Sequence, residues 1–269
     1  MKIIESFIQG KTSDFSLCED GIYISDNIIA VIDGVTSKTE KRFDGKKGGA
    51  FAKDVIIDSL SDEAVEMLSC SDLFAYLTKS LNDACRNCYS DLQKYEYPKC
   101  AIVLYNAIYN EIWSVGDCQC IINSNLYTHE KYIDKINSQM RSYILECAIQ
   151  NGASVEELLL NDVGREYILP AIKEQSKFEN TEHEYGFSIL NGFPIPESLI
   201  KKYSVKSGDE IILASDGYPV LMPSLQESEQ RLAILLRDDP LCFRCNKSTK
   251  GITKGNTSFD DRVYCKFTV

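Results

Sequence analysis

The chain has 269 residues, of which 44% are hydrophobic and 26% charged, and its 29 basic and 40 acidic residues give a net charge of −11. This length and composition are typical of a globular protein with one large core or two small ones. The negative charge disfavours nucleic acid and anionic membranes as partners, and metal cations or a basic partner fit it better. Because no apolar run approaches the roughly 20 residues of a membrane span and the N-terminus lacks a signal-peptide pattern, we expect no membrane association and a cytoplasmic location.

The first half of the sequence predicts two groups of strands separated by two helices. Apolar and β-branched runs predict strands at 2–8, 21–25, 27–32, 100–109, 111–116 and 119–123. Asp26-Asn27 is a hairpin signal between two of these strands, and Asn110 indicates a tight turn between two others. Apolar residues at helical spacing predict helices over about 48–68 and 72–95.

The middle of the chain, about 128–200, is predicted to be largely helical. Helices are expected over 130–152 and 154–178, with Gly164 and Pro170 interrupting or kinking the second. The remaining predicted elements are a short strand at 186–192, a strand at 210–214, a helix that begins with the capping box of Ser224 and Glu227, a polar loop and a final strand at 263–269. Because the strands follow one another in hairpins, we predict one α+β domain over 1–269, a four-layer αββα sandwich of two antiparallel sheets flanked by helices.

The eleven cysteines do not form a pattern typical of a disulfide scaffold. Cys85/Cys88 and Cys242/Cys245 have the spacing of zinc ligands, but the two pairs lie far apart in the sequence. We therefore favour reduced thiols over a structural zinc site. The two histidines are too few for a histidine-rich metal site, and neither lies beside a nucleophile motif of a serine hydrolase.

Carboxylates recur at the ends of the predicted strands. They are found in the steps Glu19-Asp20, Asp33-Gly34, Gly116-Asp117, Asp216-Gly217 and Asp260-Asp261. Each step alone is typical of a solvated turn, but the joint pattern favours convergence of the carboxylates at one place. Hard divalent cations take carboxylate and carbonyl oxygens as ligands, and a bound cation relieves the mutual repulsion of such a cluster. The pattern therefore predicts a metal site.

Four sequence pieces, AVIDG, WSVGDC, GDEIILASDG and SFDDRVY, resemble in the same order the acidic motifs of the type 2C family of metal-dependent serine/threonine protein phosphatases. The resemblance runs from about residue 14 to the end of the chain, except for 127–199, which does not look family-like. It implies the family's central β-sandwich flanked by helices. It also implies hydrolysis of phosphoserine and phosphothreonine esters, with a phosphorylated protein as substrate.

The resemblance further implies roles for single residues. Asp33 would bridge two metal ions, and Gly34 would give its backbone carbonyl to one of them. Asp216 and Asp260 would complete the coordination of the other, so that these three aspartates carry the catalysis. Two or more Mn²⁺ or Mg²⁺ ions suit such an all-oxygen site, and they would activate a bridging water as the nucleophile.

Two further positions of the resemblance have less defined roles. Cys18-Glu19-Asp20 resembles the early Glu-Asp step of the family, so either Glu19 or Asp20 would lie near the second metal. Asp117 would be a supporting carboxylate or a ligand of an additional metal.

The sequence also departs from the family pattern. Phe15 stands where many members carry an arginine that binds the substrate phosphate, and candidate substitutes are Lys11, Lys38, Arg42, Lys46 and Arg262. No histidine follows Asp33-Gly34, and Gly48-Gly49 is a candidate replacement for the glycines expected there. Asp261 replaces an asparagine.

These departures favour one alternative, a catalytically weak relative that binds phosphoproteins or regulators. IDGVTS is superficially similar to the motif of aspartyl-phosphate phosphatases, but it lacks the second aspartate and the strand–helix alternation of that fold.

Overall fold

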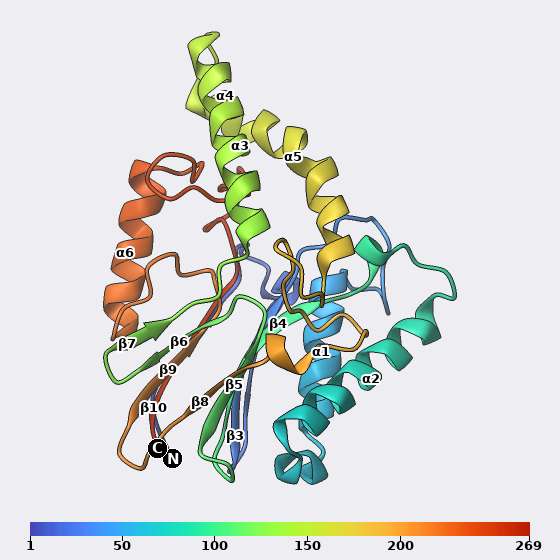
Figure 1. The fold of residues 1–269 in the computed structure, drawn as a ribbon. Helices are drawn as coiled ribbons and strands as arrows, with labels where there is room; N and C mark the ends of the chain where they lie inside the picture. The colour runs from blue at the N-terminus through green and yellow to red at the C-terminus, as the bar shows by residue number, and fades with distance from the viewer.

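The computed structural model describes residues 1–269 and contains two five-stranded antiparallel sheets packed face to face (Figure 1). The first sheet has the strand order β1-β10-β9-β6-β7, and the second has the order β2-β3-β4-β5-β8. The strands are β1 (Lys2–Gln9), β2 (Asp20–Ile24), β3 (Ile28–Gly34), β4 (Cys100–Asn106), β5 (Glu111–Val115), β6 (Gln119–Ile122), β7 (Asn125–Tyr127), β8 (Lys201–Ser204), β9 (Glu210–Ala214) and β10 (Arg262–Thr268). The predicted α+β sandwich of two antiparallel sheets is confirmed.

The helices are α1 (Gly48–Leu60), α2 (Cys70–Cys88), α3 (Tyr132–Gln150), α4 (Val155–Leu160), α5 (Val163–Glu174) and α6 (Leu225–Asp238). Short 3-10 helices lie at η1 (Phe15–Leu17), η2 (Glu63–Met67), η3 (Lys94–Glu96), η4 (Gln175–Phe178) and η5 (Glu197–Leu199). None of the helices combines the length and the apolar character that crossing a bilayer requires.

Strand β3 shows why the two sheets stack. Its side chains alternate between two cores, since Ile29 and Val31 pack between the sheets, whereas Ile28 and Ile32 pack under α1 and α2. All four side chains are fully buried. A strand that is apolar on both faces can be satisfied only inside a layered structure, which is why this run of sequence lacks the polar alternation of a surface strand.

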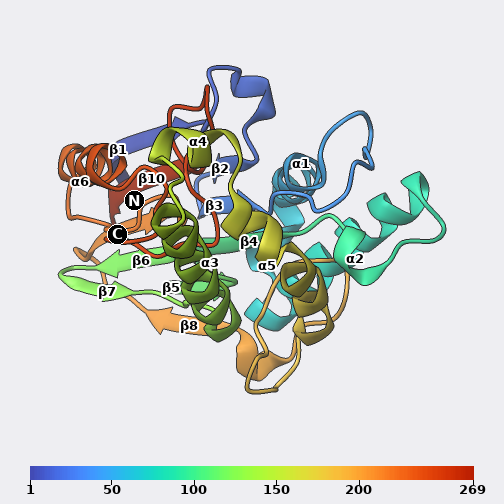
Figure 2. The same ribbon diagram turned by 90° about the horizontal axis from the view of Figure 1, so that it is seen from above.

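The outer layers are helices of unequal number. On α2, residues Leu73, Leu77 and Leu81 form one buried stripe against the second sheet, as the helical spacing predicts. The first sheet is covered by α6 alone, through residues such as Leu232. The other three helices, α3 to α5, belong to neither layer and stand above one end of the sandwich (Figures 1 and 2). Helices therefore flank both sheets, as predicted, but unequally, with α1 and α2 on the second sheet and α6 on the first.

Several predicted boundaries differ from the structure. The first two helices end earlier than predicted, at Leu60 and Cys88, and η2 and η3 occupy part of the remaining length. The predicted strand at 186–192 is absent, because this apolar stretch makes only isolated bridges such as Leu190 to Cys100. Strands β7 and β8 were not predicted, and both are short strands at sheet edges.

The break between α4 and α5 also lies elsewhere than predicted. It falls at Asn161-Asp162, where the Asp162 side chain accepts a hydrogen bond from the backbone N–H of Arg165 and caps α5. Gly164 lies inside α5 and allows α5 to approach α3, because a Cβ atom there would lie 2.8 Å from the carbonyl oxygen of Arg141. Pro170 is also inside α5.

Candidate metal centre

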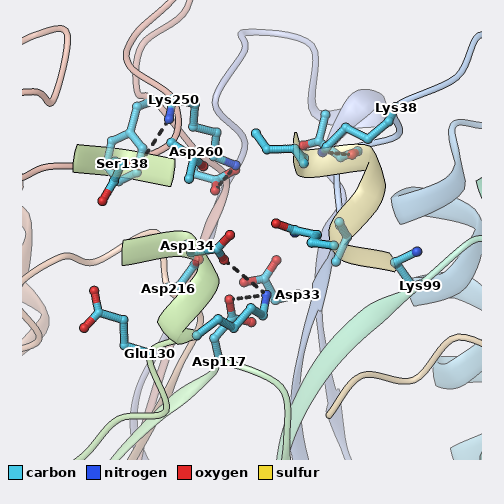
Figure 3. Close-up of a pocket in the computed structure, with 18 of the residues that line it drawn as sticks. Asp33, Lys38, Lys99, Asp117, Glu130, Asp134, Ser138, Asp216, Lys250 and Asp260 are labelled. Carbon is cyan, nitrogen blue, oxygen red and sulfur yellow. Dashed lines mark hydrogen bonds and ion pairs between the residues drawn. The ribbon is translucent and has the colours of Figure 1, made fainter. Parts of the chain in front are cut away.

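The strand-end carboxylates reach one end of the sandwich from both sheets. In the second sheet, Asp20 at the start of β2 pairs directly with Asp33 near the end of β3. In the first sheet, Asp216 follows β9 and Asp260 precedes the antiparallel neighbour β10. In two adjacent antiparallel strands, the end of one lies beside the start of the other. The topology therefore brings Asp20 close to Asp33 in one sheet and Asp216 close to Asp260 in the other. Figure 3 shows Asp33, Asp117, Asp216 and Asp260 around one cavity.

The carboxylates of this cluster repel one another. Burial, together with the charges of Asp20 and Asp260, raises the pKa of Asp33 well above its usual value. Burial and the charge of Asp33 do the same to the pKa of Asp216. Asp20, only 3% exposed, also has a raised pKa, through burial and the charges of Asp260 and Asp261. The ionised cluster is therefore incomplete without additional positive charge.

Three lysines supply part of that charge, and of these only Lys11 was a candidate from the sequence. The Lys11 ammonium lies 3.0 Å from Glu19 and 3.0 Å from Asp261. Lys131 lies 2.6 Å from Asp117, and Lys250 forms an ion pair with Asp260. Burial alone would raise the pKa of Asp260, but Lys250 and Lys11 outweigh it and lower that pKa.

Oxygens without hydrogen-bond partners fit a hard cation at this site. Glu19 Oε1 and Asp20 Oδ2 are buried and accept no hydrogen bond. A Cβ atom added to Gly49 would lie 2.7 Å from Glu19 Oε1 and 2.8 Å from the carbonyl oxygen of Gly34, so the absent side chain leaves these two oxygens facing a shared space. Carboxylate and carbonyl oxygens are the ligands that Mg²⁺ and Mn²⁺ prefer.

The carboxylates line the cavity without forming a compact ligand set. No three His, Cys, Asp or Glu side chains of the chain form a ready group for a metal ion. The ammonium groups of Lys131 and Lys250 hold Asp117 and Asp260 instead. Asp33 and Asp216 form no ion pair, and they are the carboxylates most available to a divalent cation.

Asp261 holds the loop that carries Glu19. Its two carboxylate oxygens accept hydrogen bonds from the backbone N–H of Lys11, at 2.7 Å, and of Glu19, at 3.1 Å. A carboxylate can accept both bonds and also pair with the Lys11 ammonium, whereas an amide would present one oxygen and one NH₂ group. Asp261 therefore positions the early acidic residues.

A cavity of about 400 Å³ lies above the carboxylates. Its floor contains Asp33, Asp117 and Asp216, and its far wall comes from the middle segment, which we define as residues 128–200. From that segment the cavity is lined by residues that include Lys131, Asp134, Ser138, Arg165, Gln175 and Glu179. None of these was predicted as a site residue, because a single polar or charged side chain on or beside a helix has no local pattern that separates it from an ordinary surface residue.

The middle segment is anchored over the cavity by a buried arginine. Arg141 on α3 is fully buried and forms a 2.6 Å ion pair with Asp162, which precedes α5. Its guanidinium also donates to the carbonyl oxygens of Leu241, at 2.7 Å, and Cys242, at 3.1 Å. These bonds link α3, α5 and the loop after α6, which is the loop that carries Lys250.

The two cysteine pairs lie in different parts of the fold. Cys85 is on the buried face of α2, and Cys242 is buried in the cluster under α6. Cys245, three residues beyond Cys242, is exposed. The four sulfur atoms therefore belong to separate environments, and all eleven cysteines are free thiols in the structure.

The solved catalytic domain of the serine/threonine protein phosphatase PstP, in complex with two manganese ions, matches 100% of this chain and 100% of its own length, with a TM-score of 0.50 and 15% sequence identity. This chain has the fold of that phosphatase. PstP/Ppp from Mycobacterium tuberculosis matches with a TM-score of 0.49 and 15% identity over 98% of this chain and 97% of its own. Stp1 from Staphylococcus aureus matches with a TM-score of 0.49 and 12% identity over 100% and 95%.

At this level of identity the likeness establishes the fold alone. The sequence matches no model of a known protein family, and no curated protein matches it with significance. The four-layer sandwich implied by the sequence motifs is confirmed by the likeness to PstP.

Proposed function

We propose that the chain forms one metal-dependent phosphatase domain that hydrolyses phosphoserine and phosphothreonine esters of a phosphorylated protein. The observation that carries this proposal is the meeting of Asp33 and Asp216, from opposite sheets, at one cavity where neither carboxylate has an ion-pair partner. The presence of two manganese ions in the PstP catalytic domain supports a divalent-cation site on this fold.

The residues that would hold the cations are those that the sequence motifs indicate. Asp33 and Asp216 would bind them directly, Asp20 and Asp260 would complete the site, and the carbonyl of Gly34 would add an oxygen. When bound, such cations lower the pKa of a water molecule to produce a nucleophile and neutralise the charge of a phosphoryl group.

The chain itself supplies a partly enclosed cavity with acidic and basic walls. The middle segment screens the carboxylates from bulk solvent, which strengthens every charge interaction inside the cavity. Asp117 is held by Lys131 and lies beside Asp134, so it serves as a supporting carboxylate in this arrangement.

The alternative is a regulatory module that binds phosphoproteins without turnover. The ion pairs of Lys11, Lys131 and Lys250 favour it, because ammonium groups already neutralise part of the acidic cluster. The same ion pairs leave Asp33 and Asp216 unpaired, and for this reason we place catalysis first.

Hydrolysis of p-nitrophenyl phosphate and of phosphopeptides over a Mn²⁺ titration separates the two functions. We expect Mn²⁺-dependent release of phosphate that is lost in Asp33→Asn. The matched control is Asp91→Asn, an exposed aspartate that does not line the cavity, which should behave as the parent. A parent protein that binds phosphopeptides but releases no phosphate at any Mn²⁺ concentration would establish the alternative.

A further inference from the structure

Three cationic side chains line the cavity without a carboxylate partner, and two of them, Lys38 and Arg165, are partly buried, whereas Lys247 is exposed. Lys38, in the loop between β3 and α1, donates only to the carbonyl oxygen of Thr36, two residues before it. Arg165, on α5, donates through its guanidinium to the carbonyl oxygen of Thr249 at 2.8 Å. Both line the cavity, and neither takes part in an ion pair. The three lysines beside the carboxylates, Lys11, Lys131 and Lys250, are by contrast each paired with an acid.

The surroundings make these two charges costly. Burial lowers the pKa of Lys38 well below its usual value, and the nearby positive charges of Arg165 and Lys250 lower it further. Burial also lowers the pKa of Arg165. Like charges gathered in a partly desolvated space, with only neutral carbonyl groups as partners, are stabilised when an anion enters between them.

Among the basic residues that could replace the missing arginine, the structure selects Lys38. Lys11 is held by Glu19 and Asp261, Lys46 by Asp54 and Arg262 by Glu229, and Arg42 lies outside the cavity lining. Phe15, at the position where the arginine is expected, is 56% exposed and does not line the cavity. Lys38 is thus the one sequence candidate that faces the cavity and is free of acidic partners.

The positions of Lys38 and Arg165 suit a two-residue anion site. Lys38 lies on the side of the cavity opposite Asp260 and Lys250 (Figure 3), and it approaches from the end of β3, five residues after Asp33. Arg165 approaches from the middle segment. In phosphoryl transfer the charge spreads over the equatorial oxygens of the transferred group. A phosphate group between Lys38 and Arg165 would place such oxygens against the two cations, inside the cavity that Asp33 and Asp216 also line.

We propose that Lys38 and Arg165 together bind the phosphate group of the substrate, a phosphate monoester on a protein side chain, so that the middle segment forms part of the substrate site. This inference rests on the proposed function for the nature of the substrate. The phosphate contact would then come from the loop between β3 and α1 and from α5, and not from the segment that contains Phe15. Helix α5 would have a direct role in binding.

Inorganic phosphate binding, measured by calorimetry with and without Mg²⁺, tests the proposal on the full chain. The variants are Lys38→Gln, Arg165→Gln and the double variant, with Arg42→Gln as the control because Arg42 is exposed in the same loop as Lys38. Since a hydrogen bond to a charged group contributes about 1.5–3 kcal/mol, each single variant should weaken phosphate binding about tenfold or more. Arg165→Lys, which keeps the charge, should recover part of the affinity.

With phosphopeptides, the same variants should raise KM by a similar factor, while the affinity for Mn²⁺ stays at the parent value. Phosphate affinity equal to the parent's in both single variants, or a parent that binds no phosphate in either condition, would overturn the proposal. A parent that hydrolyses phosphopeptides although Lys38→Gln and Arg165→Gln bind phosphate normally would leave the proposed function standing and refute only this inference. A parent that binds phosphate through these residues but hydrolyses no phosphopeptide would support this inference and refute the proposed catalytic function.

Discussion

Replacing Asp216 with asparagine should abolish turnover and stabilise the metal-free protein at the same time. The Asp216 carboxylate follows β9, faces the cavity and has a pKa raised by burial and by its acidic neighbours, chiefly Asp33. Asparagine keeps the size and removes the charge, so packing is preserved while the repulsion disappears. If Asp216 were only a turn residue, the exchange would change neither activity nor stability, because asparagine suits turns equally well.

The two expected effects have different sizes. Relief of an unpaired, partly buried charge should raise the free energy of unfolding of the metal-free protein by about 1–3 kcal/mol. For a chain of this length that gain corresponds to roughly 2–10 °C in Tm. Loss of a direct ligand should lower kcat by about 100-fold or more, since even residues that only support metal ligands contribute 10- to 100-fold.

The assay pairs two measurements on the same protein samples. One is Mn²⁺-dependent kcat on a phosphopeptide together with the Mn²⁺ dissociation constant, and the other is Tm in the presence of a chelator. Asp91→Asn serves as the control for the loss of an exposed carboxylate. Unchanged Mn²⁺ affinity combined with unchanged Tm would show that Asp216 is not part of a metal centre.

Two other predictions concern the surroundings of the site. Lys250→Gln should tighten Mn²⁺ binding, measured by calorimetry, roughly tenfold, because the ammonium paired with Asp260 competes with the cation for that carboxylate. Weaker Mn²⁺ binding in the variant would mean that Lys250 supports the site instead. His129 bonds to the Tyr203 hydroxyl at 2.7 Å, and burial together with Lys201 lowers its pKa. The stabilisation of the fold by neutral His129 should therefore be present above about pH 6.5, the ordinary pKa of a histidine. It should be lost as the pH falls below that value, because the unfolded chain then binds a proton that the folded protein does not. The free energy of unfolding of His129→Gln should vary less than the parent's between pH 7 and 5, and superimposable profiles would contradict this.

Much of the fold could be predicted from local sequence patterns because the relevant forces act over a few residues. The apolar run before Asp33 predicts a buried strand, and Ser224 predicts a helix start, since its side chain accepts the N–H of Glu227 as a capping residue does. The stretch 186–192 is an exception. It has the apolar residues of a strand, but its backbone pairs with neighbours only at single positions.

The acidic half of the site was predictable for a related reason. The carboxylates end strands, and strand ends are marked in the sequence by glycine and by the change from apolar to polar residues. Whether Asp33 and Asp216 would meet was not predictable from these local signals, because they belong to different sheets and their approach depends on how the sheets stack.

The basic half of the site was decided by tertiary structure. Lys131, Arg165 and Lys250 come from the residue before α3, from α5 and from a loop that is distant in the sequence. They reach the cavity because Arg141 ties α3 to the segments beside it. By itself the sequence determined which residues end the strands and hence the acidic composition of the site. Only the packing of the middle segment decided which cations face those acids, because an ion pair depends on distance in space, and a lysine on a surface helix has the same local pattern as a lysine beside a buried aspartate.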